Sequence, residues 1–308
     1  MSIPLAPPEP RELPPEGPAG DPSEAPVSLH EAYRVCERIA RTHYENFPVA
    51  SRFLSRDRRN ALAAIYAFAR KADDVADAAA PSEDRLRALD AIEAAFQRAL
   101  EGDPRGPILT ALADAVERHA LSAEPFLDLL EAFRMDARDA TFATWDDLLA
   151  YCRGSANPVG RLVLALYGIE DPPALRASDA VCTALQLTNF WQDLAQDLDR
   201  GRLFIPREDL DRFGIAPERL RLPESRGGLS SLLDHECRAT GDLFARGESV
   251  TRAAPGLLAI HLRASIAGGR AILREVRRLG WRVLERRPTL SAPSRVRILL
   301  RALAGLHD

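Results

Sequence analysis

The chain has 308 residues, of which 45 are acidic and 41 are basic, and its formal net charge is −4 at neutral pH. This length allows a large buried core without a disulfide framework. A hydrophobic fraction of 46% and a charged fraction of 28% exclude a fully disordered chain. A charge this close to zero gives no reason to expect nucleic acid as a partner.

The cysteines and the apolar runs indicate the compartment. The four cysteines are far apart and form no CxxC pair: Cys36, Cys152, Cys182 and Cys237. Neither a disulfide framework nor a zinc site is predicted from that spacing. Because each cysteine lies among apolar residues, we expect buried, reduced thiols and a cytoplasmic protein. No apolar run approaches the ~20 residues of a membrane span, and no secretory signal is expected.

The N-terminal segment differs in composition from the rest. Residues 1–27 hold nine of the 23 prolines and few large apolar residues, so we predict a disordered tail that forms no core. The folded part is predicted to begin near Ser28, an N-cap with Glu31 at the capping-box position. From there one domain is predicted over residues 28–308.

The pattern after Ser28 is helical almost throughout. Apolar residues recur at helical spacing, prolines or glycines separate most stretches, and no alternating run predicts a strand. The predicted helices cover roughly 29–45, 58–79, 83–101, 107–119, 124–138, 145–153, 157–167, 174–199, 230–252, 255–281 and 293–305. Residues 201–228 are predicted to form a loop over one end of the bundle. The predicted fold class is all-α.

One face of the predicted helix 58–79 carries three carboxylates, one guanidinium and one phenol. At 100° per residue these side chains share one side: Tyr66, Arg70, Asp73, Asp74 and Asp77. A solvated surface is an equally good interpretation of this stripe taken alone.

A second stripe lies on the predicted helix 174–199. Its four oxygen-bearing side chains are Gln186, Asn189, Asp193 and Asp197. The other positions are largely apolar, and a polar stripe inside an apolar helix must be satisfied by something. Asn and Gln have no advantage over Lys or Glu in solvent, so a solvated surface is the weaker interpretation here.

If the two stripes face each other, five aspartates converge. Unpaired, they would repel and raise one another's pKa values. All-oxygen ligands favour Mg²⁺, which tends to share its coordination shell with substrate phosphates. The remaining helices supply Ala, Leu, Val and Phe. The residues therefore predict a magnesium-dependent diphosphate site that caps an apolar cavity for a long prenyl chain.

Over about residues 29–290 the chain resembles the squalene/phytoene synthases. The resemblance rests on YAFARKADDVAD (66–77) and QLTNFWQDLAQDLDRGRLFIP (186–206). It implies the isoprenoid synthase fold, an α-helical bundle with a central apolar cavity, and a prenyl diphosphate substrate.

Within that family the chain is most similar to the bacterial HpnC-type branch. The similarity lies in HYENFPVAS (43–51), YCRGSANPVGRL (151–162) and NFWQD. The branch is associated with hopanoid precursors and converts presqualene diphosphate, a C30 compound, and water to hydroxysqualene and diphosphate. The resemblance therefore implies this reaction, with hopanoid-pathway enzymes upstream and downstream as candidate partners.

The resemblance also implies roles for individual residues. The metal ligands would be Asp73, Asp74, Asp77, Asn189, Asp193 and Asp197. Catalysis would rest on Asp73, Asp77, Asp193, Asp197, Tyr66 and Tyr151. Substrate binding would involve Phe47, Arg70, Gln186, Asn189, Gln192, Arg286 and Asn157. Asn157 is a candidate to position water, although Asn-Pro at a helix start is more often a cap.

The chain departs from the family pattern at several polar positions. Gln192 stands where condensing relatives often have Arg. The usual His-Ser-x-Ser-Phe becomes His43-Tyr44-Glu45-Asn46-Phe47, and Phe204 replaces Tyr. Fewer cationic and hydroxyl donors favour a substrate with one diphosphate. The alternatives are a squalene or phytoene synthase that condenses two prenyl diphosphates, and a non-catalytic helical scaffold, against which the intact aspartate motifs argue.

The C-terminal segment is strongly basic. From Arg263 to Arg301 there are 11 arginines and only two acids, Glu275 and Glu285. Apolar residues from Val296 to Leu306 follow helical spacing. A helix that closes the bundle is one interpretation, and a peripheral contact with anionic lipid on the inner face of the membrane is the other.

Overall fold

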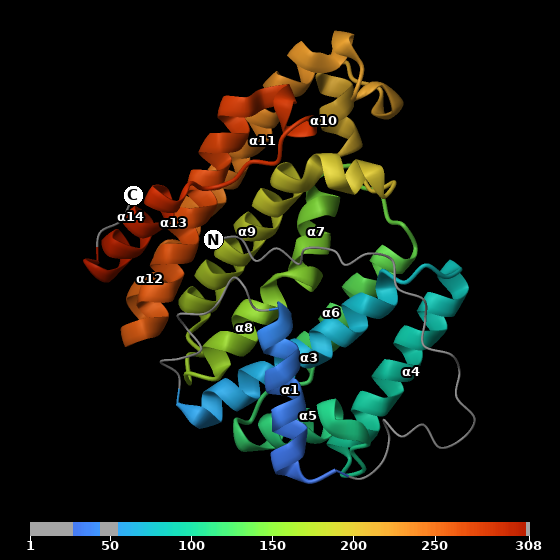
Figure 1. The fold of residues 1–308 in the computed structure, drawn as a ribbon, viewed down its shortest axis with the longest axis vertical. Helices are drawn as coiled ribbons and strands as arrows, with labels where there is room; N and C mark the ends of the chain where they lie inside the picture. The colour runs from blue at the N-terminus through green and yellow to red at the C-terminus, as the bar shows by residue number, and fades with distance from the viewer. Residues whose placement is uncertain (1–26, 44–54, 306–308) are drawn as a thin grey trace. The chain divides into compact units, whose positions relative to one another are not determined.

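The computed structural model describes residues 27–43 and 55–305, and every regular element within these ranges is a helix (Figure 1). The predicted all-α fold class is confirmed. Residues 1–26 of the predicted tail lie outside the described residues, as do Glu45, Asn46 and Phe47. The chain divides into two compact units, which are described separately. The single domain predicted over residues 28–308 stays a prediction.

Among the described residues, the N-terminal unit comprises 27–43, 55–140 and 161–168. Its helices are α1 (Leu29–His43), α3 (Arg56–Ala76), α4 (Ser82–Leu100), α5 (Gly106–Arg118) and α6 (Glu124–Ala137). Helices α1, α3 and α5 pack on one another, and α4 and α6 also pack against α3. Three buried rings join α3, α4 and α6, with centroids 5.2 to 5.7 Å apart: Phe68, Phe96 and Phe126. Helix α3 is therefore the centre of this unit.

Local sequence sets the ends of the helices in this unit. The Ser28 hydroxyl accepts a hydrogen bond from the Glu31 backbone N–H at 3.3 Å, as predicted for the start of α1. Ser55 caps α3 in the same way, accepting from the Arg58 N–H. Alanines fill the middle of α3, which favours the helix and leaves little bulk between it and its neighbours. The helix ends at Ala76, with Asp77 as its C-cap, three residues before the predicted end.

Among the described residues, the C-terminal unit comprises 141–160 and 169–305. Its elements are α7 (Trp145–Ser155), the start of α8 (Asn157–Ala165), α9 (Pro172–Asp199), α10 (Arg207–Arg212), α11 (Arg226–Gly247), α12 (Val250–Ala253), α13 (Gly256–Leu279), the 3-10 turn η4 (Gly280–Leu284) and α14 (Ala292–Leu303). Helix α9 packs against α7, α11 and α13, and α14 packs against α13 (Figure 1).

Helix α9 is held firmly in this unit. Asp171 caps its start by accepting from the Ala174 N–H at 3.1 Å. Trp191 is fully buried and donates its indole N–H to Thr240 of α11 at 2.9 Å. Helix α11 approaches so closely that a Cβ at Gly247 would lie 2.6 Å from the Ala177 carbonyl oxygen. These contacts fix the rotation of α9 about its axis, and with it the direction of its polar stripe.

The predicted loop 201–228 contains helical turns. It holds α10 and two short 3-10 turns, Pro217–Arg219 and Pro223–Ser225, and α11 begins at Arg226 rather than near residue 230. Glu208 and Asp209 occupy the first turn of α10, and the Arg207 N–H donates to the Phe142 carbonyl at 2.9 Å. A helix this short depends on such tertiary contacts and leaves no periodic signal in the sequence.

The four cysteines are free thiols that are buried or half-buried. Cys36, Cys152 and Cys237 are buried free thiols, and Cys182 is half-buried. Burial raises the pKa of Cys36 to about 12, which keeps this thiol unreactive at neutral pH.

One described helical stretch, Gly256–Leu284, is long and apolar enough by length and composition to cross a membrane, although no such run was predicted. Because 56% of its most apolar window is buried, this is a weak indication of a span.

Candidate functional site

The first polar stripe is a compact ionic cluster on α3. The Arg70 guanidinium is nearly fully buried and donates to the carboxylates of Asp73 at 3.0 Å and Asp74 at 2.7 Å. Both acceptors follow Arg70 by one helical turn, so the helix itself sets this geometry. The structure thus brings Arg70, Asp73 and Asp74 together.

The charge balance of this cluster is negative. Burial, the neighbouring Asp77 and, to a smaller extent, Asp136 and Asp74 together raise the pKa of Asp73 to about 8, against the opposing effect of Arg70. Burial also raises the pKa of the Tyr66 phenol, against the opposing effect of Arg70. Asp136 lies in the last turn of α6 and was not predicted, because a lone acid at a helix end carries no periodic signal.

The donor set of this cluster fits a hard divalent cation. One buried guanidinium faces several carboxylates, and the raised pKa of Asp73 means that, with no further positive charge, the cluster takes up a proton. Among the described residues no three carboxyl, imidazole or thiol groups converge on one point. Magnesium ions are commonly held by only one or two carboxylates together with water and substrate phosphates. The arrangement fits that mode and does not resemble a closed metal cage.

The second polar stripe lies on α9. Gln186, Asn189, Asp193 and Asp197 are all half-buried, between neighbours that are mostly buried. Arg287 binds Asp193 with two nitrogens: its Nε donates to Oδ1, and its Nη2 donates to Oδ2 at 3.1 Å. This two-pronged contact fixes the carboxylate and is one of the stronger ion-pair geometries in proteins. A guanidinium therefore already balances the charge of Asp193 in the second aspartate motif.

The segment before α14 is tied to the same turn of α9. The Gln192 side chain is 3% exposed and donates from Nε2 to the Pro288 carbonyl at 2.7 Å. Arg286, which was predicted to meet diphosphate, is exposed, and its role stays a prediction. The structure places the neighbouring Arg287 at α9 instead. Arg286 was chosen by its resemblance to a family arginine, and that resemblance did not separate it from the adjacent Arg287.

An aromatic cluster lies beside the α9 stripe in the C-terminal unit. Tyr151 is buried, and its ring centroid is 5.3 Å from Phe142, 6.2 Å from Phe190 and 6.0 Å from Phe204. Phe190 and Phe204 stack at 3.9 Å with an angle of 2° between their planes. Tyr151 was predicted, whereas the convergence of three phenylalanines was missed. Ring faces of this kind attract cations.

Asn157 takes part in a contact between helices. It is buried, and its amide oxygen accepts a hydrogen bond from the Thr183 hydroxyl of α9 at 2.9 Å. The contact ties the start of α8 to α9. Its predicted role in positioning water stays a prediction.

Comparison with known proteins identifies the family. The family model described as squalene/phytoene synthase matches residues 40–294. The chain belongs to the squalene/phytoene synthase family. It is therefore related to enzymes that act on prenyl diphosphates, and both aspartate clusters lie inside the matched region.

Individual members of this family are similar to the chain to different degrees. A hydroxysqualene synthase of Rhodopseudomonas palustris is 37% identical over 213 residues, which is 68% of this chain and 72% of that protein. A phytoene synthase of Mycobacterium tuberculosis is 34% identical over 227 residues, or 72% and 74% of the two chains. The crystal structure of squalene synthase HpnC from Alicyclobacillus acidocaldarius is 42% identical, covers 83% of this chain and 97% of that one, and has a TM-score of 0.78.

Proposed function

We propose that this protein is a hydroxysqualene synthase, which converts presqualene diphosphate and water to hydroxysqualene and diphosphate. The observation that carries the proposal is the buried, neutral Gln192, hydrogen-bonded to the Pro288 carbonyl at the position where condensing relatives often have Arg. The similarity to squalene synthase HpnC and to a hydroxysqualene synthase supports it.

The number of diphosphates decides between the reactions. Joining two prenyl diphosphates means holding two highly charged groups near several aspartates, which needs additional guanidinium and hydroxyl donors. Arg70 is committed to Asp73 and Asp74, and Arg287 is committed to Asp193. Each of these two arginines thus already shares its charge with aspartates, and Gln in place of Arg at position 192 adds no further charge, so the site favours one diphosphate rather than two.

In the proposed reaction the C–O bond to diphosphate breaks, and diphosphate leaves with the electron pair. The cyclopropylcarbinyl cation rearranges, a water oxygen attacks the resulting allylic cation, and the water loses a proton to give the alcohol. Arg70 would bind the leaving diphosphate, and its burial would strengthen that contact. The cluster of Tyr151, Phe190 and Phe204 would present ring faces to the cation and exclude bulk water.

We propose Mg²⁺ as the cofactor. The predicted ligands are Asp73, Asp74, Asp77, Asn189, Asp193 and Asp197. When bound, Mg²⁺ neutralises negative charge on the diphosphate oxygens. The carboxylates would orient the diphosphate against Arg70, and Gln192 would remain neutral beside the developing cation, where Arg would repel it.

A second candidate is a phytoene or squalene synthase that condenses two prenyl diphosphates. The similarity to a phytoene synthase over 72% of this chain favours it. In both candidates a prenyl diphosphate ionises to a cation. In the first candidate water captures the cation, and in the second the cation is joined to a second prenyl diphosphate. A cytoplasmic location and a place among hopanoid-pathway enzymes go with the first candidate and remain proposals.

Parallel product analysis tests the proposal. Purified protein with Mg²⁺ is given farnesyl, geranylgeranyl or presqualene diphosphate in separate reactions, without a nicotinamide cofactor. We expect presqualene diphosphate to be consumed and hydroxysqualene to be the main product. Efficient formation of presqualene diphosphate, squalene or phytoene, with added presqualene diphosphate left untouched, would contradict the proposal and favour the second candidate.

A matched pair of variants checks that the activity belongs to this site. Asp193→Asn should abolish turnover, because Asp193 is predicted to bind Mg²⁺. Asp199→Asn removes a carboxylate from the last turn of the same helix, where Asp199 is exposed and pairs with Arg221, and it should keep activity. Equal loss in both variants would point to damage of α9 rather than to the site.

A further inference from the structure

Helix α14 turns an apolar stripe toward solvent. Val296, Leu300 and Leu303 are 57%, 61% and 55% exposed, more than any other large apolar side chain in the described part of the chain. Their spacing of four and three residues places them on one side of the helix. The opposite side packs on α13, where Ala302 is buried and Ile298 and Leu299 are half-buried. The exposed stripe is therefore additional to the face that closes the bundle.

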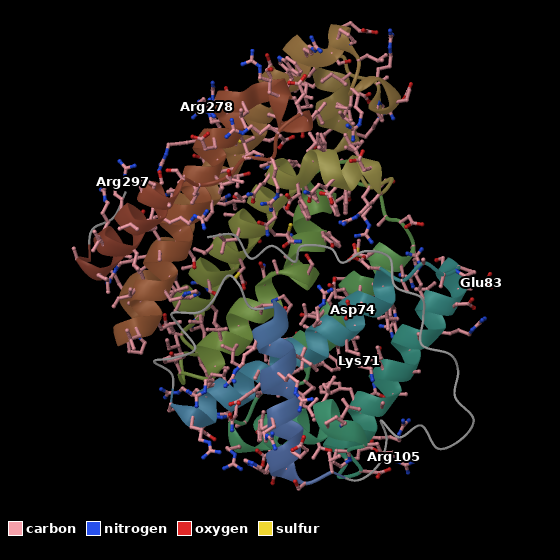
Figure 2. All side chains as sticks on the ribbon, in the orientation of Figure 1. Lys71, Asp74, Glu83, Arg105, Arg278 and Arg297 are labelled. Carbon is pink, nitrogen blue, oxygen red and sulfur yellow. The ribbon has the colours of Figure 1, made fainter. Side chains whose placement is uncertain are left out.

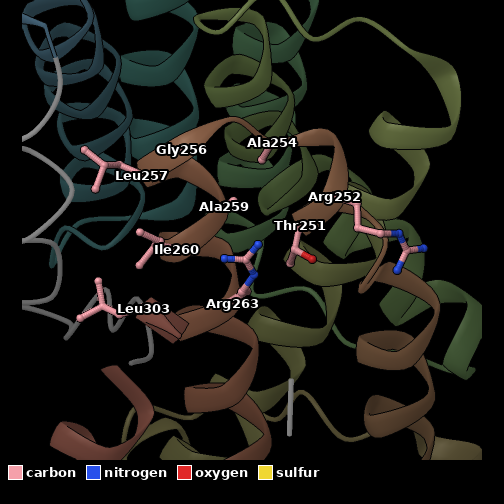
Figure 3. A pocket seen from close by; sticks show the side chains of 9 residues that line it. All are labelled: Thr251, Arg252, Ala254, Gly256, Leu257, Ala259, Ile260, Arg263 and Leu303. Carbon is pink, nitrogen blue, oxygen red and sulfur yellow. The ribbon is translucent and has the colours of Figure 1, made fainter. Parts of the chain in front are cut away.

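The stripe continues onto the start of α13. Leu257 is 40% exposed, and with Ile260 and Leu303 it lines an open pocket of about 550 Å³. Arg252 and Arg263 line the same pocket. Figure 3 shows the Arg263 guanidinium beside Ile260, whereas Arg252 points away from the three apolar side chains. The α14 patch, defined as these residues with Val296 and Leu300, combines an apolar surface with cationic groups.

The charges around the stripe have one sign. Arg295 and Arg297 are exposed on α14, and Arg297 projects outward in Figure 2. Arg295 donates to the Leu290 carbonyl and Arg297 to the Ser294 hydroxyl, and neither forms an ion pair with a carboxylate of the described residues. Their charge is thus available to an external anion.

The positive charge around the α14 patch distinguishes between two possible binding partners, a second copy of the chain and an anionic membrane. A second copy of the chain, docked through the same face, would bring arginines against arginines. An apolar stripe flanked by unneutralised cations fits the interface of an anionic bilayer, where apolar side chains enter the acyl boundary and arginines meet the phosphates. We propose that the α14 patch docks the protein on anionic lipid membranes, with α14 lying in the plane of the surface.

Vesicle binding by the full-length protein tests this proposal independently of the reaction. The probes are vesicles of phosphatidylcholine with phosphatidylglycerol, and vesicles of phosphatidylcholine alone. We expect co-sedimentation with the anionic vesicles only. Binding should be lost in about 1 M salt, where the Debye length shrinks to ~3 Å.

Two double variants and their matched controls locate the contact. Arg295→Gln with Arg297→Gln should weaken binding about 30-fold, at ~1 kcal/mol for each arginine near the surface. The control is Arg207→Gln with Arg219→Gln, which removes two arginines of similar exposure from the same unit and should leave binding unchanged. Leu300→Ser with Leu303→Ser should weaken binding at least roughly ten-fold. Its control is Leu100→Ser with Leu222→Ser, which replaces two exposed leucines elsewhere.

The outcomes are distinct. Loss of binding in both α14 variants but in neither control supports the proposal. Absence of binding by the unaltered protein, or equal binding by all variants, would overturn it. Concentration-dependent dimers that the leucine variant abolishes, without vesicle binding, would assign the patch to a second copy. Circular dichroism of each variant separates lost docking from lost folding.

Discussion

Replacing Arg287 tests whether its ion pair with Asp193 stabilises the packing of the segment before α14 against α9. Its guanidinium binds both oxygens of Asp193, which is 12% exposed, while the Arg287 side chain is 33% exposed. Arg287→Gln keeps much of the side-chain length but removes the charge and the two-pronged donor. The Asp193 carboxylate would then be half-buried beside a neutral amide.

The expected cost lies between two limits. Exposed ion pairs are worth about 0.2–1 kcal/mol, and breaking a fully buried pair costs about 3–5 kcal/mol, because a charge is left without compensation. Asp193 is closer to the buried limit and Arg287 closer to the exposed one. We therefore expect Arg287→Gln to lower the free energy of unfolding by about 1–3 kcal/mol in the absence of metal.

A double-mutant cycle isolates the pair. The free energy of unfolding is measured by denaturant titration for the unaltered protein, Arg287→Gln, Asp193→Asn and the double variant. We expect a coupling energy above about 1 kcal/mol. The exposed neighbour supplies the control, and Arg286→Gln should change stability by less than about 0.5 kcal/mol. Additivity of the two substitutions within about 0.3–0.5 kcal/mol would refute the reasoning.

Three further predictions concern stability and metal. Burial and the neighbouring Asp209 raise the pKa of Glu236 from 4.5 to about 9. The folded state thus holds this proton more tightly, and stability should fall by roughly 1.4 kcal/mol per pH unit between pH 5.5 and 8. Glu236→Gln should flatten this dependence of stability on pH, which denaturant titration at several pH values measures. An unchanged dependence in the variant would count against a raised pKa of Glu236. Gly247→Ala would press a methyl group onto the Ala177 carbonyl oxygen, so thermal denaturation should show a loss of more than about 1 kcal/mol; full stability would show that α9 and α11 can separate at little cost. Asp73→Ala should abolish turnover with unchanged helical circular dichroism, as should removal of metal by EDTA, and full activity after EDTA treatment would exclude the proposed cofactor.

The α-helical fold followed from the sequence because most helices here bury a long, periodic apolar face. The same spacing placed Arg70, Asp73 and Asp74 together, since neighbours on one helix are fixed by its pitch. Helix α10 was missed because its six residues form little more than one turn. Its stability depends on contacts with distant residues, such as the carbonyl of Phe142.

The parts of the site that were missed come from different elements. Arg287 contacts Asp193 although it lies 94 residues further along the chain. The periodicity of one helix cannot predict which distant residue will contact it. Asp136 acts on Asp73 from α6 for the same reason. Phe142 and Phe204 lie in connecting segments, so their stacking around Tyr151 follows only from the tertiary structure.

The origin of the product oxygen tests the central claim most directly. Purified protein is incubated with presqualene diphosphate and Mg²⁺ in water enriched in oxygen-18, and the product is examined by mass spectrometry. We predict hydroxysqualene that carries the heavy isotope in its hydroxyl group, because a water molecule captures the cation after diphosphate has left. Failure to consume presqualene diphosphate, or a product without oxygen from the solvent, would contradict the proposed function.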